Sequence, residues 1–474
     1  MKRERVSQMS DTRRTGNVEL DAQIVELDQD RERDSRPPAF TDEALALHFA
    51  QRHVGNLRYV AGWSRWLIWN GVRWQCDDTL QAFDFARKIC REAAAACNKT
   101  KTAAMLASAK TVGAVLTLAK ADRRLAATVD QWDADPWLLN TPASVIDLRT
   151  GRSRPHRPDD YVTRLAGMAP DASCSMPTWL QFLDRVTGND ATLISFMQRM
   201  AGYALTGLTR EHALFFCYGT GANGKTTFIN AITSCAGDYH RTAPIETFTD
   251  SKNERHPTDL AGLRGARLVI AVETEEGRRW AESKIKALTG GDRIAARFMR
   301  QDFFEFMPTF KLMIAGNHKP GLRSVDEAIR RRFHLVPFVV TIPPDERDRT
   351  LGDRLRAEWP GILAWMIAGC MEWQEQGLSP PEAVTSATAA YLEAEDALAA
   401  WLDEACTRDA NAWETTTALY ASWTSWADHT GEHAGSMKRF VQSVEARGLV
   451  PERRNHGRGF AGLRLRSDLY SNRY

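Results

Sequence analysis

Residues 218–228 read YGTGANGKTTF and match the phosphate-loop pattern G-x-x-x-x-G-K-[ST] at Gly219, Gly224, Lys225 and Thr226. In such a loop the glycines let successive backbone N–H groups curl around phosphates, the lysine reaches the outer two, and the hydroxyl reaches magnesium. The apolar run HALFFCYG before it and KTTFINAITSCAG behind it predict the strand and the helix that a phosphate loop connects. This context disfavours the alternative, a chance glycine turn.

Outward from the loop, residues 211–342 alternate apolar runs with helical stretches, which is typical of a parallel α/β sheet. The apolar runs are ALFFCYG, ARLVIAVE, FKLMIAGN and FHLVPFVV. Residues 177–206 have helical periodicity and predict a two-helix unit before this region. The predicted fold class is therefore α/β, with a P-loop core.

Polar residues follow two of the predicted strands. The run RLVIAVETEEG ends in Glu273, which we expect to be the magnesium-holding and water-polarising carboxylate, with Glu275 as an alternative or helper. The other interpretation is an ordinary strand that ends in a solvated acidic turn. Asn317 ends the run FKLMIAGN, where its amide could meet a γ-phosphate or the attacking water; asparagine also caps turns.

Two basic features lie near these strands. Arg330, Arg331 and Arg332 are consecutive, and one of them could stabilise charge on a transferred phosphoryl group in a neighbouring subunit; a solvated basic helix face is the alternative. The segment RIAARFMRQDFFEFMP (293–308) alternates like two short strands that meet near Arg300 and Gln301. A hairpin with basic residues at its tip suggests an element that tracks DNA.

The amino-terminal part predicts a separate α+β region. Residues 1–37 mix both charge signs and are expected to be a disordered arm. Residues 57–78 predict a hairpin around Asn70-Gly71 that carries Trp63, Trp66, Trp69 and Trp74. We favour an aromatic mini-core over a stacking platform for single-stranded nucleic acid. A second hairpin is predicted around Thr150-Gly151.

The composition limits the class of protein. With 62 basic and 60 acidic residues the formal net charge is +2, so nucleic-acid contacts must come from local basic patches. The eight cysteines form no C-x-x-C pair, which argues for a reduced intracellular chain and against a zinc ribbon. No apolar run has membrane length and no signal peptide is recognisable, so we expect a cytoplasmic protein without membrane contact.

The carboxy-terminal part predicts a winged helix. Ser436 is a good N-cap, MKRFVQSVEAR is amphipathic, and Gly448 suits the end of the helix. The helix would offer Lys438 and Arg439 to DNA bases, and the basic hairpin that follows would place its arginines on phosphates. A protein-docking domain with a solvated basic strand is the alternative. The hairpin residues proposed to contact DNA are Arg453, Arg454 and Arg458.

The motifs GTGANGKTT, ARLVIAVETEEG, IKALTGGDRIAARF, FKLMIAGNHKP and DEAIRRRFHLVPF occur in this order and spacing. In this respect the chain resembles superfamily 3 helicases of the phage and plasmid replication-primase type, a group that includes the poxvirus nucleoside triphosphatase. The resemblance covers roughly residues 40–342, since DADPWLLNTPASVIDLRTG and the Trp-rich hairpin resemble the amino-terminal helicase-associated domain of that family.

The resemblance implies an AAA+-like ring, usually a hexamer, that uses ATP and Mg²⁺ to move 3′ to 5′ on single-stranded DNA. It implies forked DNA and further copies of the chain as partners, possible contacts to a separate primase, polymerase or origin-binding protein, and the cytoplasm of a bacterial host. Only the short arm precedes the helicase-associated region, so we do not expect primase activity. A loader or remodelling ATPase is the main alternative; a DNA-binding protein with a silent loop is a third.

The family's functional positions fall on residues of this sequence as follows. The nucleotide would contact Gly219, Gly221, Asn223, Gly224, Lys225, Thr226 and Thr227, and Mg²⁺ would be held by Thr226 and Glu273. Asn317 falls on the sensor and Arg331 or Arg332 on the trans-acting finger, while Lys286, Arg297, Arg300 and Gln301 fall on or beside the DNA hairpin. Ala222 stands where relatives usually have glycine, and Arg330 where they have a hydrophobic or aromatic residue, which leaves the choice of finger open.

The expected organisation has an arm (1–37), a helicase-associated α+β domain (38–175) and a helical collar (176–210). An AAA+-like P-loop core (211–342), a helical extension (343–380) and a winged-helix-like domain (381–474) follow.

Overall fold

The computed structural model describes residues 37–250, 258–273, 278–300, 302–322, 325–432, 434–445, 447–454 and 457–466. The chain divides into two compact units. The first unit runs to Ala134 and includes His156–Thr163, and the second comprises Asp135–Pro155 and everything from Arg164 onward.

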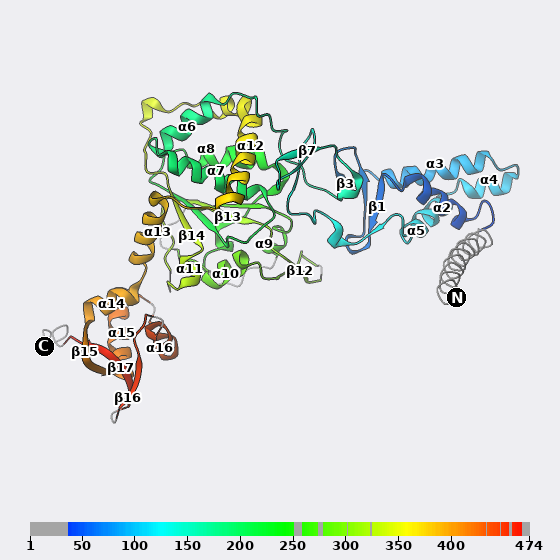
Figure 1. Cartoon of the computed structure of the whole chain (residues 1–474). Helices are drawn as coiled ribbons and strands as arrows, with labels where there is room; N and C mark the ends of the chain where they lie inside the picture. Colours follow the sequence, from blue (N-terminus) through cyan, green and yellow to red (C-terminus); the bar gives the residue numbers. More distant parts are fainter. Residues whose placement is uncertain are drawn as a thin grey trace, which may run out of the picture. The chain divides into compact units, whose positions relative to one another are not determined.

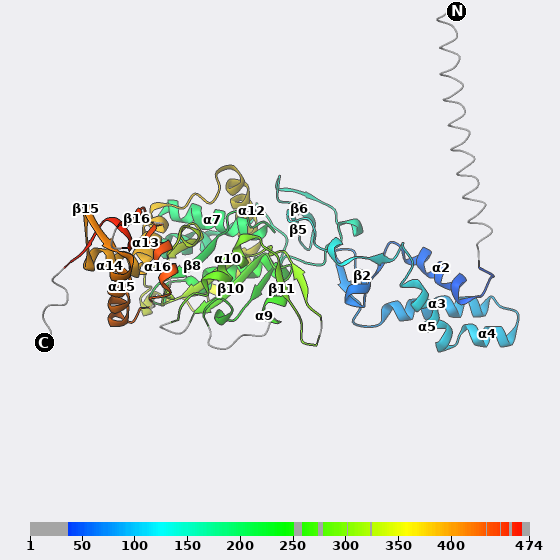
Figure 2. The same ribbon diagram turned by 90° about the horizontal axis from the view of Figure 1, so that it is seen from below.

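The first unit joins a helical layer to a small sheet (Figure 2). Its helices enclose a core that includes Phe49, Ile89, Val112 and Val115. In the sheet, of order β3-β2-β1-β4, β1 pairs antiparallel with β2 and parallel with β4. The elements are α2 (Asp42–His53), β1 (Leu57–Val60), η1 (Ala61–Trp63), β2 (Arg65–Trp69), β3 (Trp74–Cys76), α3 (Gln81–Ala95), α4 (Thr100–Leu106), α5 (Ala109–Ala119), β4 (Ala126–Ala127), η2 (Val129–Gln131) and η3 (Pro158–Asp160).

The tryptophans of this hairpin pack against other aromatic rings: Trp69 contacts Trp74, Trp63 contacts Trp132, and Trp66 contacts Phe49 and Tyr59. Asn70 turns β2 into β3, since its side-chain oxygen accepts hydrogen bonds from the backbone N–H groups of Val72 and Arg73. Trp74 is 1% exposed, lies edge-on to Trp132, and donates from its indole nitrogen to the carbonyl of Pro158. This arrangement agrees with the predicted aromatic mini-core.

A parallel sheet of order β14-β8-β13-β10-β9 forms the centre of the second unit. Every neighbouring pair is parallel, which confirms the α/β class predicted from the apolar runs. All six residues of β13 are buried, because helices cover both faces of the sheet. The strands are β8 (Leu214–Tyr218), β9 (His240–Thr242), β10 (Leu268–Glu273), β13 (Lys311–Gly316) and β14 (Phe333–Pro337).

Helices lie on both faces of this sheet (Figure 1), and each face has its own hydrophobic core. One face is covered by α6 (Pro177–Thr187), α7 (Ala191–Leu205), α8 (Lys225–Ala236) and α12 (Leu351–Gln376). The other is covered by α9 (Thr258–Ala261), α10 (Glu282–Gly290) and α11 (Glu327–Arg330). Short 3-10 turns link these elements at η4 (Gly237–Tyr239), η5 (Ile245–Thr247) and η6 (Pro344–Glu346). The two predicted helices before the phosphate loop are α6 and α7.

The unit boundary differs from the predicted one at residue 175. The second predicted hairpin is present as β6 (Val145–Asp147) and β7 (Arg152–Arg154), with β5 (Leu138–Asn140) beside β6. Leu139, Ile146 and Leu148 of this small sheet are buried in the same core as α6 and α7. Their apolar side chains therefore attach residues 135–155 to the second unit.

The last part of the chain forms a small module with its own core, here called the C-terminal module (residues 397–466). Its sheet has the order β15-β17-β16, and Trp401, Leu419 and Phe440 are buried beneath it. It does not begin at residue 381 as predicted, because α13 (Glu382–Ala394) packs on β14, where the Thr388 hydroxyl accepts from the Leu335 N–H. The elements are α14 (Ala397–Ala405), β15 (Cys406–Thr415), α15 (Thr416–Thr430), α16 (Met437–Glu445), β16 (Pro451–Arg454) and β17 (Gly457–Leu465).

Among the described residues no single helix is long and apolar enough to cross a membrane. The consecutive helices α4 and α5 reach the required length and composition only when taken together, across a bend of 55°.

His334 of β14 makes the stability of the second unit depend on pH. Its ring packs on Phe215 at 5.5 Å and Phe196 at 6.2 Å, and burial lowers its pKa to about 4. The unfolded chain binds a proton near pH 6.5, so the free energy of unfolding should fall as the pH drops from about 6.5 to about 4. We expect a loss of about 2 kcal/mol, less than the full shift implies because the ring is partly exposed.

Urea unfolding at pH 7.5 and pH 4 measures this loss. The variant His334→Gln has no titrating ring and should lose less stability over the same interval. Parallel losses in the wild type and the variant would show that other groups cause the pH dependence.

Candidate functional site

The candidate site lies where the carboxyl ends of the central strands meet. The phosphate loop follows β8, Glu273 ends β10, and Asn317 directly follows β13. The register pairs Glu273 with Gly316 and Gly316 with Tyr218, so the ends of these strands are level. Ligands of open α/β sheets bind at this edge. The side chain of Glu273 is not among those the structure describes, and Glu275 lies outside the described residues.

The loop backbone has the conformation that an anion cradle requires. Gly221 and Gly224 have φ of 104° and 84°, which L side chains rarely adopt. A Cβ at Gly224 would lie 2.5 Å from a methyl carbon of Val186 and 2.9 Å from the ring of Phe182, so no larger residue fits without displacing α6. Ala222 adopts a φ of 47°, so its side chain stands on left-handed backbone at a position where the family resemblance leads us to expect glycine.

Lys225 carries its amine into the centre of the loop. The side chain is 7% exposed, and Nζ donates to the Gly219 carbonyl at 2.7 Å and to Oδ1 of Asn223 and Asn317, both at 3.1 Å. Burial lowers the pKa of this amine. The amine of Lys225 thus contacts three neutral oxygens and no negative charge among the described residues. This arrangement suits an anionic ligand, whose charge would pair with the amine.

Asn223 is the loop residue that links the lysine to the neighbouring strand. Its amide nitrogen donates to the carbonyl of Phe338 at 2.7 Å, while its oxygen accepts from Lys225. The sequence placed Asn223 at a nucleotide contact but could not show that the side chain is 3% exposed and orients Lys225.

The loop opens into a hollow of about 490 Å³. Lys225, Thr226 and Thr227 line it from the start of α8, and Val272 and Asn317 from the ends of β10 and β13. Thr226 is exposed, so its hydroxyl is available to a metal ion that arrives with a ligand. A second hollow of about 500 Å³ shares Ala222, Gly224 and Thr227 and extends along α6 past Phe182. Apolar side chains such as Phe182, Ile342 and Leu351 line this second hollow together with charged ones such as Arg185 and Arg347.

The predicted hairpin is present as β11 (Ile294–Ala296) and β12 (Phe304–Phe306), which pair antiparallel. At the tip, Arg300 is exposed and has a φ of 60°, and the guanidinium of Arg297 lies 4.7 Å from the ring of Phe303. Met299 and Phe303 are 68% and 60% exposed, an apolar feature that the prediction did not include. Gln301 lies outside the described residues. Lys286 forms an ion pair with Asp326, so it is already paired.

The three consecutive arginines occupy different environments. Arg332 is 6% exposed and donates from Nε to the Thr289 hydroxyl at 3.0 Å and from Nη1 to the Ala328 carbonyl at 2.7 Å. Arg330 forms an ion pair with Asp396 at 3.4 Å. Arg331 is exposed; its backbone N–H donates to the Glu327 carbonyl, but its guanidinium has no hydrogen bond or ion pair to a described residue. Solvent exposure and bonding partners thus distinguish three arginines that the sequence alone left equivalent as candidate fingers.

Basic side chains gather on the C-terminal module. Lys438 and Arg439 are exposed in the first turn of α16. Arg453 of β16 lies directly opposite Arg458 of β17, and both are exposed. Like charges at directly opposed positions destabilise a strand pair, so this pair is suited to an anionic partner. Arg454 is instead paired with Glu452 at 2.9 Å.

The structure also shows a functional candidate that sequence reasoning missed. Asp396 directly precedes the apolar helix α14, so the sequence could have identified it as an N-cap. No pattern in the neighbouring sequence indicates its ion pairs with Arg330 and Arg447.

The geometry defines an α/β protein with a phosphate loop at the carboxyl edge of a parallel sheet. Comparison with known families gives two matches: residues 46–188 match the family described as D5 N terminal like, and residues 217–332 match a family of unknown function, DUF5906. The resemblance to D5-like superfamily 3 helicases that the motifs predicted is confirmed.

Similar proteins occur in large DNA viruses. "Putative helicase L207/L206" of Acanthamoeba polyphaga mimivirus is 22% identical over 339 residues, which cover 65% of this chain and 35% of that protein. "Putative helicase 022R" of Frog virus 3 is 26% identical over 268 residues, covering 52% of this chain and 27% of that protein. The matched region is thus about a third or less of these relatives. They come from viruses of eukaryotes, so the bacterial host expected from the sequence is not supported.

Among solved structures, the apo form of the NrS-1 C-terminal region (305–718) is similar with a TM-score of 0.49 and 9% identity, covering 89% of this chain and 99% of that chain. A similarity at this level does not bear on function.

Proposed function

We propose that this chain is an ATP-dependent DNA helicase of a viral or mobile-element replication system. The observation that carries the proposal is the amine of Lys225, buried in a phosphate loop and held by Asn223 and by Asn317 of the next strand end. The viral relatives named as helicases support the same role at a coarser level.

ATP with Mg²⁺ is the nucleotide we propose. The left-handed loop backbone and the buried amine fit a triphosphate, which would accept hydrogen bonds now made to neutral oxygens. Thr226 and the carboxylate of Glu273 would hold the magnesium ion, which supplies charge neutralisation at the phosphates when bound. Glu273 would orient the attacking water and Asn317 would sense the γ-phosphate. The hollow beside Phe182 is the place we propose for the base.

Arg331 is the finger that we propose, in preference to Arg332. A residue that stabilises charge in a neighbouring subunit must be exposed and free of local partners. Arg331 meets both conditions, whereas the guanidinium of Arg332 is enclosed and hydrogen bonded to Thr289. The proposal includes an AAA+-like ring of identical subunits, with six expected by family resemblance, in which each site is completed by its neighbour.

We propose that the protein translocates along single-stranded DNA in the 3′ to 5′ direction. The hairpin tip with Arg297, Arg300 and Gln301 would follow the strand, while Lys286 would only support the hairpin region through its ion pair. The element order of the C-terminal module, with sheet order β15-β17-β16, supports a winged helix. Its proposed DNA contacts are Lys438, Arg439, Arg453, Arg454 and Arg458.

A strand-displacement assay tests this function. Arg300→Ala should reduce unwinding at least tenfold and leave ATP hydrolysis without DNA within about twofold, because Arg300 lies outside the nucleotide hollow. The matched control is Arg349→Ala, which changes an exposed arginine that lines neither hollow and should unwind DNA like the wild type. Wild-type unwinding by Arg300→Ala would show that the hairpin tip does not contact the translocated strand.

An ATPase that loads or remodels proteins on DNA is the second candidate, because the exposed Met299 and Phe303 could also contact a protein. It is favoured if the wild type hydrolyses ATP but separates neither 3′-tailed nor 5′-tailed duplexes.

A further inference from the structure

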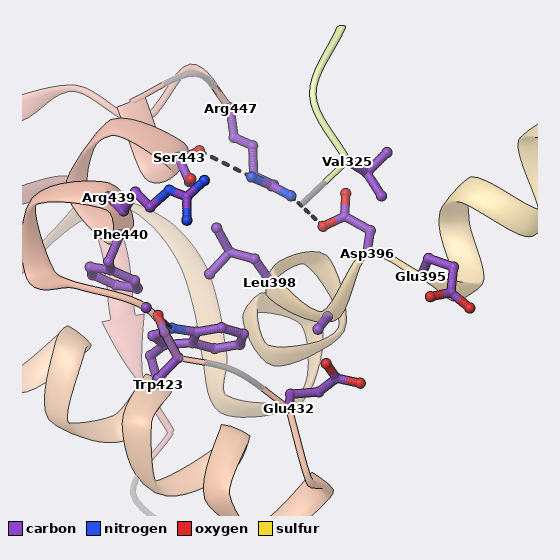
Figure 3. A pocket seen from close by; sticks show the side chains of 13 residues that line it. Val325, Glu395, Asp396, Leu398, Trp423, Glu432, Arg439, Phe440, Ser443 and Arg447 are labelled. Carbon is purple, nitrogen blue, oxygen red and sulfur yellow. Dashed lines mark hydrogen bonds and ion pairs between the residues drawn. The ribbon is translucent and has the colours of Figure 1, made fainter. Parts of the chain in front are cut away.

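A nearly buried carboxylate, Asp396, bonds to Arg447 of the C-terminal module (Figure 3) and also pairs with Arg330 of α11. Asp396, 9% exposed in its side chain, accepts a hydrogen bond from Nη2 of Arg447 and lies 3.4 Å from Nη2 of Arg330. Its Oδ1 also caps α14 by accepting from the Ala399 N–H at 3.2 Å. Charge-assisted pairs of low exposure hold geometry better than pairs at the surface, because water does not screen them.

The two arginines come from different parts of the chain. Arg330 ends α11 and directly precedes Arg331, while Arg447 follows α16 in the C-terminal module. Arg439 of the same helix lines the small hollow of about 80 Å³ beside Asp396. The carboxylate thus joins the turn that carries the three arginines to the helix that carries the module's exposed basic residues.

Neighbouring contacts hold the chain between Asn317 and α11. The Glu395 carboxylate accepts from the Leu322 N–H at 2.8 Å, and the Tyr391 hydroxyl donates to the Pro320 carbonyl. Arg279, bridged to Gly321, pairs with Glu432 of the module at 3.6 Å. These contacts limit the freedom of α11, which has only four residues.

The arrangement leaves one arginine free between two that are held. Asp396 holds Arg330 and Thr289 holds Arg332, so Arg331 alone projects without a partner among the described residues. The direction of Arg331 depends on both anchors, because neighbouring residues of a short helical turn share one backbone.

On the basis of the proposed function, we propose that Asp396 is a positioning residue that aims Arg331 and makes ATP hydrolysis depend on the docked C-terminal module. Loss of its charge would leave Lys225, Asn223 and Asn317 in place. It would therefore lower kcat and not the affinity for ATP.

Steady-state ATP hydrolysis by the full chain with single-stranded DNA tests this proposal. Asp396→Asn keeps an N-cap side chain but removes the charge, and we expect kcat to fall about tenfold with KM unchanged. The matched control Asp403→Asn changes an exposed aspartate of the same helix and should keep the wild-type kcat. A wild-type kcat in Asp396→Asn overturns the proposal.

Three further variants test whether Asp396 acts through Arg330 and through the C-terminal module. Arg330→Gln alters a side chain that is 40% exposed, so it should fold and reproduce the loss of kcat even if Asp396→Asn is unstable. The double variant Asp396→Asn/Arg330→Gln should be no slower than either single variant; multiplicative losses would show that Asp396 does not act through Arg330. Arg447→Gln should lower kcat in the same direction, and a wild-type kcat there would remove the module from the proposal.

The result for the wild type separates the two proposals. If the wild type hydrolyses ATP and the Asp396 and Arg330 variants match it, only the positioning role fails. If the wild type hydrolyses no ATP, the proposed function fails and the positioning role fails with it.

Discussion

Lys225→Ala is expected to lower ATP hydrolysis by about 10²–10³-fold and to abolish strand displacement, since one preorganised charged donor at a transferring group contributes on this order. The amine is the only cation among the described residues that line the hollow of the loop. Its removal leaves Oδ1 of Asn223 and Asn317 to face the phosphates without a compensating charge. Phosphate release under saturating ATP and Mg²⁺ measures the effect.

Controls separate the loss of chemistry from the loss of fold. Lys101→Ala changes an exposed lysine of the first unit and should hydrolyse ATP like the wild type. Melting temperatures should be compared as well, because three oxygens lose a donor in Lys225→Ala. Hydrolysis within a factor of three of the wild type, in a folded Lys225→Ala variant, would contradict the assignment of the loop.

Arg331→Ala is expected to lower ATP hydrolysis by about 10³-fold, the lower end of the range for an arginine finger. The melting temperature should not change, because the guanidinium of Arg331 is exposed and makes no hydrogen bond to a described residue. Arg332→Ala should behave differently. It removes one buried and one partly buried hydrogen bond and is expected to destabilise the fold by about 1–3 kcal/mol.

A mixing experiment tests whether Arg331 acts on a neighbouring subunit. Lys225→Ala and Arg331→Ala should each hydrolyse ATP only at the strongly reduced rates given above when assayed alone. In a mixture, some interfaces combine an intact Lys225 with an intact Arg331 from the next subunit, so part of the activity should return. Mixtures that stay inactive while forming rings, or an active Arg331→Ala variant, would show that Arg331 is not a finger in trans.

The elements best predicted from sequence are those defined by short-range patterns. The phosphate loop, the parallel strands around it and the hairpins at Asn70-Gly71 and Thr150-Gly151 were all recognisable, because turn chemistry and apolar periodicity depend on neighbouring residues. The motif order also predicted the family resemblance. The roles of Glu273, Asn317 and the DNA-contacting residues stay predictions.

Boundaries were predicted less well, because they depend on packing between distant segments. Residues 135–155 would form the same hairpin whichever unit they packed against. Only the burial of Leu139, Ile146 and Leu148 with α6 and α7 attaches them to the second unit. In the same way, the sequence of α13 does not indicate which element it packs against. In the structure α13 contacts β14, so it belongs with the central sheet and not with the C-terminal module.

Local sequence therefore determined the phosphate loop and the strands around it, since backbone conformation and periodicity are properties of adjacent residues. Tertiary structure alone distinguished Arg330, Arg331 and Arg332, which have the same chemistry at adjacent positions. Their burial and partners come from Thr289 and Asp396, residues far away in the chain. Charge pairs and solvent exposure arise only when such segments meet, and no pattern in the sequence contains them.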